Sequence, residues 1–199
     1  MNNHVKQAPV QGITGLGGGP SGALMSGVSG NTFVDQVYAQ NIFTGNDTDN
    51  RDIVNGIDLS GEGGAIWQFV RNVSGRDNTT YDTVRGVFKQ LNLQSQGAET
   101  DLSGNNGGVK QFNSNGFRLE SGARNNSGED YVAYTFRKAA GFFDIVTYTG
   151  NNSNRTISHN LGSTPGVIII KKRNSGSTPW TMFHRSLGAT KYMKLNSKD

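Results

Sequence analysis

Cysteine is absent and proline is scarce, with 0 Cys and 4 Pro among 199 residues. Without thiols, no disulfide or thiolate metal site can stabilise the fold, which excludes the disulfide-stapled secreted modules. So little proline excludes collagen-like and proline-rich chains. Hydrophobic residues amount to only 33%, which is low for a compact globule.

Long apolar runs are also missing. No stretch approaches the roughly 18 residues of a membrane-spanning helix. The first residues do not combine a positively charged segment with an apolar one, as signal peptides do. We therefore expect no membrane partner and, if the protein ends up outside a cell, exit inside a particle or by lysis. The absence of cysteine fits assembly in a reducing cytoplasm.

Glycine is abundant, at 28 of 199 residues, and Asn, Ser and Thr accompany it. These residues favour turns because they accept left-handed or locally bonded backbone. Between them lie short segments rich in β-branched and aromatic residues, whereas sustained helical periodicity is absent. We expect strands at 33–44, 53–59, 65–71, 84–93, 131–138, 142–149, 167–173 and 191–195. The sequence thus predicts an all-β fold of antiparallel β-sandwich domains, jelly-roll or lectin-like, in tandem.

Residues 1–32 differ from the rest and predict an extended, glycine-rich arm. Such a segment cannot bury enough apolar surface to offset its ordering entropy alone. We expect it to anchor the chain against another protein by strand addition or groove binding. The apolar side chains expected to contact that partner are Ile13, Leu16, Leu24, Met25, Val28 and Phe33.

Residues 42–92 recur as 147–196 at an offset near 104, as from Arg51 to Arg155. The repeat predicts that Trp67 and Ile169 lie on equivalent strands. It also suggests three regions: the arm at 1–32, a first β-sandwich at 33–143 and a partial second repeat at 144–199. Because half a sandwich would leave an apolar face and open edges, we expect the second repeat to be truncated from a longer chain.

Motifs that would indicate catalysis, cofactor binding or metal binding are weak in this sequence. Residues 17–22 match the dinucleotide-binding glycine pattern, but no strand precedes them and no helix follows. Asp47, Asp49 and Asp52 favour a hairpin turn over calcium, since Arg51 occupies a would-be ligand position. His159 and His184 lack metal-ligand spacing and are expected to make local hydrogen bonds. We expect no catalytic residue, cofactor or metal, although a dispersed catalytic triad stays open.

Two tryptophans could stack on sugars. Trp67 lies in an apolar strand and is expected in the core. Trp180 follows Pro179 in a turn, so it is the candidate for contact with a host-surface glycan.

Net charge is +4, and the excess lies near the C-terminus, in a basic run at 171–173 and further Lys and Arg beyond it. We interpret these residues as a solvated face of a sheet and expect no nucleic-acid partner.

Several ordered strings resemble a known family. They are Asn55–Gly64, Tyr81–Gly86, Phe112–Phe117, Thr135–Asp144, Ile157–Gly166 and Phe183–Gly188. Over about residues 40–196 the chain resembles a repeated domain of unknown function in virion structural and tail-fibre-like proteins of marine bacteriophages. The family offers no catalytic residue to transfer. The resemblance implies a location in the virion, virion proteins as partners, and a homotrimer, as is common in fibres.

Three functions are open at this stage. The leading hypothesis is a structural virion component that is not an enzyme, namely a tail fibre or a fibre-like protein. An alternative location for such a fibre is the capsid surface. The second is a lectin-like carbohydrate-binding module that recognises the receptor. The third is a depolymerase, which would need clustered carboxylates.

Overall fold

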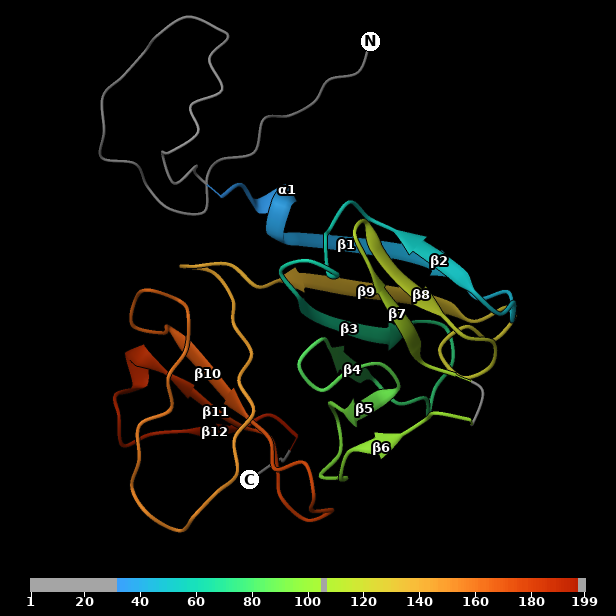
Figure 1. Ribbon diagram of the computed structural model, residues 1–199. Coiled ribbons are helices and arrows are strands. Elements are labelled where there is room, and N and C mark those ends of the chain that lie inside the picture. The colour runs from blue at the N-terminus through green and yellow to red at the C-terminus, as the bar shows by residue number, and fades with distance from the viewer. Residues whose placement is uncertain (1–31, 105–106, 197–199) are drawn as a thin grey trace, which may run out of the picture.

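The computed structural model describes residues 32–104 and 107–196, and within them nearly all regular structure is strand (Figure 1). Every pairing between named strands is antiparallel, which confirms the expected all-β antiparallel class. The elements are α1 Val34–Val37, β1 Tyr38–Thr44, β2 Arg51–Val54, β3 Gly64–Val70, β4 Thr79–Asp82, β5 Lys89–Asn92, β6 Thr100–Asp101, β7 Val109–Asn113, β8 Gly116–Leu119, β9 Asp130–Arg137, β10 Val167–Ile170, β11 Thr181–His184, the 3₁₀ turn η1 Arg185–Leu187 and β12 Met193–Lys194. No described helix is long and apolar enough to cross a membrane.

Two sheets enclose the main core. A six-stranded sheet has the order β1-β9-β3-β4-β5-β6, and a three-stranded sheet has the order β2-β8-β7. Ile66, Tyr81 and Ala133 of the first sheet are buried in one cluster with Ile53 and Phe117 of the second. The apolar residues of the two inner faces thus shield each other from water.

Strand β9 alternates between buried and partly exposed residues. Tyr131, Ala133 and Thr135 are buried on the core side, so Val132, Tyr134 and Phe136 share the opposite, outer face. Trp67 also lies on the outer face, since its neighbour Ile66 points into the core. Its ring packs edge-on against Phe136 at 5.2 Å, so the prediction that Trp67 belongs to the main core is wrong.

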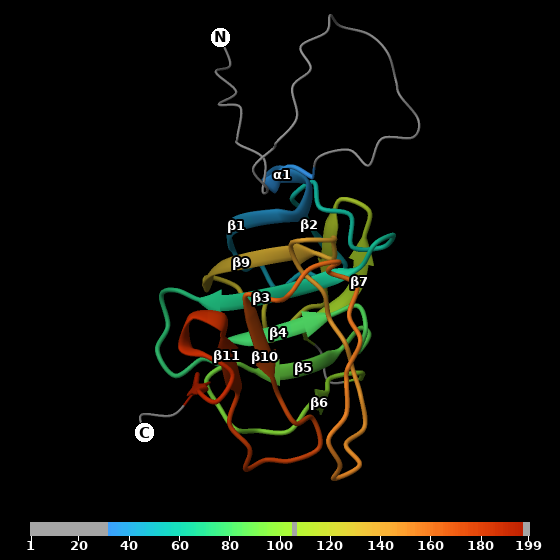
Figure 2. The ribbon, with the colours of Figure 1, turned by 90° about the vertical axis from the view of Figure 1, so that its left-hand side faces the viewer.

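The third sheet, β10-β11-β12, is here called the C-terminal sheet. It lies to one side of the six-stranded sheet, near β4 and β5 (Figures 1 and 2). Its strands follow one another as an antiparallel meander, as β3, β4 and β5 do.

The two meanders share one register. Trp67 pairs with Thr80, and Ile169 pairs with Met182, which is the same pair displaced by 102 residues. The next pairing is displaced equally, since Thr80 faces Leu91 and Met182 faces Met193. Trp67 and Ile169 therefore occupy equivalent positions. The sequence match of 88–92 with 192–196 is wrong by two residues, because the offset shortens from 104 to 102 before β10.

Hydrogen bonds beside the strands repeat as well. The backbone N–H of Asn78 donates to the side-chain oxygen of Gln94, and the N–H of Trp180 donates to that of Asn196. Near the start of each repeat, a guanidinium stacks on an aromatic ring, Arg51 on Phe43 and Arg155 on Tyr148. The correspondence thus extends from side-chain contacts to strand pairing.

Several strand predictions were wrong. Residues 34–37 form a helical turn, in which the Gln36 side chain accepts a hydrogen bond from the N–H of Phe33. The expected strand at 142–149 is absent, and 55–59 and 84–88 are turns and loop. Strands β4, β6, β7, β8 and β11 were not predicted. Each is only two to five residues long, so its few apolar residues do not form a run that stands out from the turns beside it.

Candidate functional site

The C-terminal sheet exposes positions that are buried in its counterpart. Ile66 is 0% exposed, whereas the equivalent Ile168 is 40% exposed. Gln68 is 1% exposed, and its counterpart Ile170 is 46% exposed. At this pair of positions the apolar side chain, Ile170, is therefore exposed, whereas the polar side chain, Gln68, is buried.

The exposed surface is largely aliphatic. Ile168 and Ile170 are on the same side of β10, and each is at least 40% exposed; we call this pair the open face. Exposed apolar surface that lies together marks interaction sites when it is large, because isolated soluble proteins rarely leave it uncovered.

Strand β10 also presents a free edge. Its counterpart β3 lies between β4 and β9, whereas β10 is the terminal strand of its sheet in the described part of the chain. Natural edge strands are usually blunted by charge, proline or a bulge. Residues 167–170 read Val-Ile-Ile-Ile and contain none of these.

Missing partners explain why two segments lack strand structure. Residues 143–149 correspond to β1, which pairs with β9, and residues 155–158 correspond to β2, which pairs with β8. Within the described residues, neither segment belongs to a sheet. A strand needs a neighbour to accept its backbone hydrogen bonds, so these segments are irregular there.

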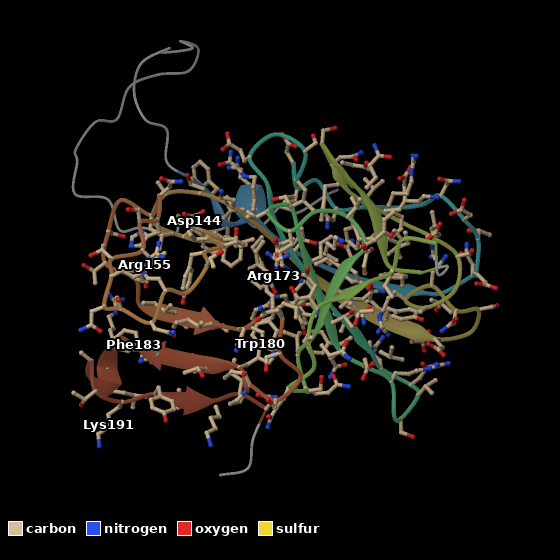
Figure 3. All side chains as sticks on the ribbon, turned by 60° about the horizontal axis from the view of Figure 1, so that its bottom comes forward. Asp144, Arg155, Arg173, Trp180, Phe183 and Lys191 are labelled. Carbon is tan, nitrogen blue, oxygen red and sulfur yellow. The ribbon has the colours of Figure 1, made fainter. Side chains whose placement is uncertain are left out.

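The C-terminal sheet is fastened to the six-stranded sheet by two anchors. Trp180 is 8% exposed, and its indole N–H donates to the backbone oxygen of Asn92 at 2.8 Å. Arg173 forms a two-pronged bond with the Glu99 carboxylate, at 2.9 and 2.7 Å. Figure 3 shows both side chains on the side of the C-terminal sheet that faces the green strands, whereas Phe183 and Lys191 lie farther out.

Glu99 is the centre of a charged group. It also accepts a bond from Arg85, whose side chain is 4% exposed and pairs with Asp82. Desolvation raises the pKa of Glu99, but the bonds from Arg173 and Arg85 outweigh it, so the pKa lies below the ordinary value. The carboxylate is therefore ionised at neutral pH and holds the two sheets together.

Lys171 belongs to the same contact, since its ammonium donates to the backbone oxygen of Gln96 at 3.0 Å. Burial lowers the pKa of Lys171. The interpretation of the basic run 171–173 as a merely solvated face is thus wrong for Lys171 and Arg173, which dock the sheet on the loop before β6.

A cavity of about 250 Å³ lies near the other end of this junction, between Glu62, Lys138 and Asp144. The Asp144 side chain is 4% exposed and forms an ion pair with Lys138 at 3.2 Å. It also accepts the backbone N–H of Asn160 at 2.7 Å. Burial raises the pKa of Asp144, but these bonds and the Ile145 N–H lower it overall. Asp144 therefore acts as a bound anion that links Lys138 to the backbone of Asn160.

The predicted site residues fall in different places. Ile13, Leu16, Leu24, Met25 and Val28 lie outside the described residues. Phe33 is 40% exposed at the start of α1. Trp180 is buried, so its expected exposure to a glycan is wrong: the turn after Pro179 directs the ring onto β5 instead of into solvent. The open face was missed, although the uninterrupted run Val167–Ile170 was a visible signal.

The loop carboxylates and histidines have local partners. Asp49 pairs with Lys110 and Asp52 with Arg118. His159 and His184 accept backbone N–H groups from Leu161 and Ser186, as predicted. Within the described residues, no three His, Asp or Glu side chains converge in a way that could hold a metal ion.

Comparison with known proteins gives one match. No curated protein and no solved structure matches the chain. A family model matches residues 35–199, across both the six-stranded and the C-terminal sheets. The family is described as a domain of unknown function. The chain belongs to this family, DUF7483.

Proposed function

We propose that this protein is a structural component of a bacteriophage particle, a tail fibre or a fibre-like protein. In this proposal residues 1–32 attach the chain to other virion proteins. Tandem β-sandwich domains of jelly-roll or lectin-like type project toward the host. The second domain begins near residue 144, and three copies assemble around one axis. The proposal assigns no catalytic residue and no cofactor.

The observation that carries the proposal is the repeated meander with its fixed junction. A β3–β5 meander that recurs at a constant offset of 102 residues, from Thr79 to Thr181, is the construction expected of a chain extended by adding similar units. The Glu99–Arg173 pair and Trp180 fix the second meander on the first. A rigid series of β units suits a projecting structural part.

The open face is a second observation that supports the same proposal. Surfaces of this aliphatic character are expected of proteins that work inside an assembly. We name the bacteriophage particle as this assembly because residues 40–196 resemble virion and tail-fibre-like proteins. The lectin-like alternative loses the residue on which it depended, because the ring of Trp180 is covered, and no other described feature favours it.

The proposal is tested by particle incorporation. We expect deletion of residues 2–32 to leave a folded protein that is absent from purified particles, as measured by quantitative mass spectrometry of the particles. Full-length protein with the exposed Val73 replaced by Ser is the matched control and is expected to incorporate normally. Immunogold labelling of particles that carry the full chain would distinguish tail from head.

Normal incorporation of the deleted protein would contradict the anchoring role of residues 1–32. Absence of the full-length protein from particles would contradict the proposed function itself.

A further inference from the structure

We propose that the C-terminal part of the molecule binds an anionic polysaccharide through a basic surface. The inference deepens the proposed function, on which it rests for its biological setting, by naming the chemical class of the receptor. Four exposed cations make up the basic surface: Arg155, Lys172, Arg185 and Lys191.

The two repeats differ in charge. Residues 147–196 contain seven basic side chains and no acidic one. Uncharged or basic residues therefore stand where the first repeat has carboxylates, for example His184 at the position of Asp82. A segment with charges of one sign is suited to a partner of the opposite sign. The acidic residues of the first repeat, 42–92, are Asp47, Asp49, Asp52, Asp58, Glu62, Asp77 and Asp82.

Carboxylates of the first repeat neutralise nearby cations. Asp82 pairs with Arg85, and Asp52 pairs with Arg118. Among residues 32–104 and 107–196, by contrast, no ion pair includes a member of the basic surface. The positive charge of the basic surface is therefore available to an anion from outside, and the attraction is strongest at low salt.

The placement of the four cations indicates a polymer. They belong to different segments: Arg155 lies in the loop 150–156, Lys172 follows β10, Arg185 begins η1 and Lys191 precedes β12. In Figure 3, Arg155 and Lys191 lie at the margin of the C-terminal part, away from the six-stranded sheet. A small anion needs groups that converge on one point, whereas a chain with repeated charges can contact cations that are spread out.

The neighbours of these cations favour a sugar polymer. The Arg155 guanidinium stacks on the ring of Tyr148, which is 49% exposed, and Tyr192 is 65% exposed. Exposed tyrosines offer both an apolar ring and a hydroxyl, which suits contact with sugar rings. Apart from Arg155, residues 151–156 have only Asn, Ser and Thr side chains, which donate and accept hydrogen bonds as sugar hydroxyls do. Such an extended contact differs from an enclosed lectin-like pocket.

The test measures binding of the full-length protein to two labelled polysaccharides by fluorescence anisotropy. The probes are heparin, which carries sulfate groups, and polygalacturonate, which carries carboxylates, so their relative affinities distinguish the two kinds of anionic group. At low salt we expect a Kd on the order of 1–10 µM for at least one of them. Raising NaCl to about 0.3 M should weaken binding at least about tenfold, because salt screens exposed charges. Uncharged dextran should not bind.

Protein variants locate the contact. Arg155→Gln, Arg185→Gln and Lys191→Gln combined should weaken binding at least about tenfold, because three attractions are lost. Lys191→Gln alone should weaken it about twofold to threefold. Arg71→Gln, which removes one charge from an exposed position on the six-stranded part, is the matched control and should leave binding unchanged. Circular dichroism should show the same fold in every variant.

Absence of binding to both probes, equal binding of dextran, or equal binding by the triple variant would overturn the proposal. So would tighter binding of a DNA oligonucleotide than of either polysaccharide at the same salt, since nucleic acid would then be the partner. A dimer in sedimentation experiments that the triple substitution abolishes would also overturn it, because the partner would then be a second copy. None of these results depends on particles, so the proposed function and this inference can fail separately.

Discussion

At the residue scale, two equivalent glycines have different surroundings, because β3 has β9 beside it and β10 has no such strand among the described residues. A Cβ placed on Gly64 would lie 2.0 Å from the backbone oxygen of Phe136 in β9, whereas a Cβ on Gly166 would meet only the Arg185 side chain, at 3.4 Å. The close approach of β9 to β3 thus requires glycine at 64, and nothing comparable constrains 166.

We expect Gly64→Ala to lower the free energy of unfolding by about 3 kcal/mol, because two backbones must move apart. Gly166→Ala, the matched control, should change it by less than about 0.5 kcal/mol. Urea denaturation of both variants measures the difference. Equal losses would mean that an unseen neighbour also crowds Gly166.

At the scale of elements, comparing the two repeats shows how far strand formation depends on having a paired neighbour as well as on the local sequence. Residues 41–44 of β1 are paired with β9, whereas the similar residues 146–149 form no strand. We expect the amides of 146–149 to exchange with solvent at least about a hundredfold faster than those of 41–44, since only the latter are held in a ladder. Hydrogen-exchange mass spectrometry tests this, and matching rates would contradict it.

The same comparison explains what the sequence could predict. The fold class, β3, β9 and β10 follow from their aromatic and β-branched residues, because such residues favour strands wherever a partner exists. The segment 142–149 has that composition and still forms no strand, since pairing depends on a distant segment that local pattern does not contain. The burial of Trp180 depends in the same way on Asn92, 88 residues away.

At the scale of the whole molecule, acid should loosen the junction between the sheets. The pKa of Glu99 in the folded protein lies below its ordinary value of 4.5. Its contribution to stability is therefore fully present above about pH 4.5 and is lost as the pH falls through the lower, folded-state pKa. The pH at which the junction opens depends on how strongly Arg173 and Arg85 bind the Glu99 carboxylate.

We expect the fluorescence of Trp180, isolated by Trp67→Phe, to shift to longer wavelength as the pH falls below 4.5, because its ring becomes hydrated. In Glu99→Gln the shift should begin at higher pH or be present already at neutral pH, since the ionic bond is absent. An unchanged pH profile in Glu99→Gln would show that another group controls the junction.

The pairing of β1 with β9 has a mechanical consequence. Tyr38 faces Phe136 and Thr44 faces Asp130, so the chain enters β1 and leaves β9 at the same end of the pair. Tension between the N-terminal side and the C-terminal sheet would first load the contacts of Arg173 with Glu99 and of Trp180 with Asn92. Once these contacts open, the seven residue pairs would separate one after another and not all at once in shear, so the junction contacts set the force at which this part of the molecule begins to lengthen.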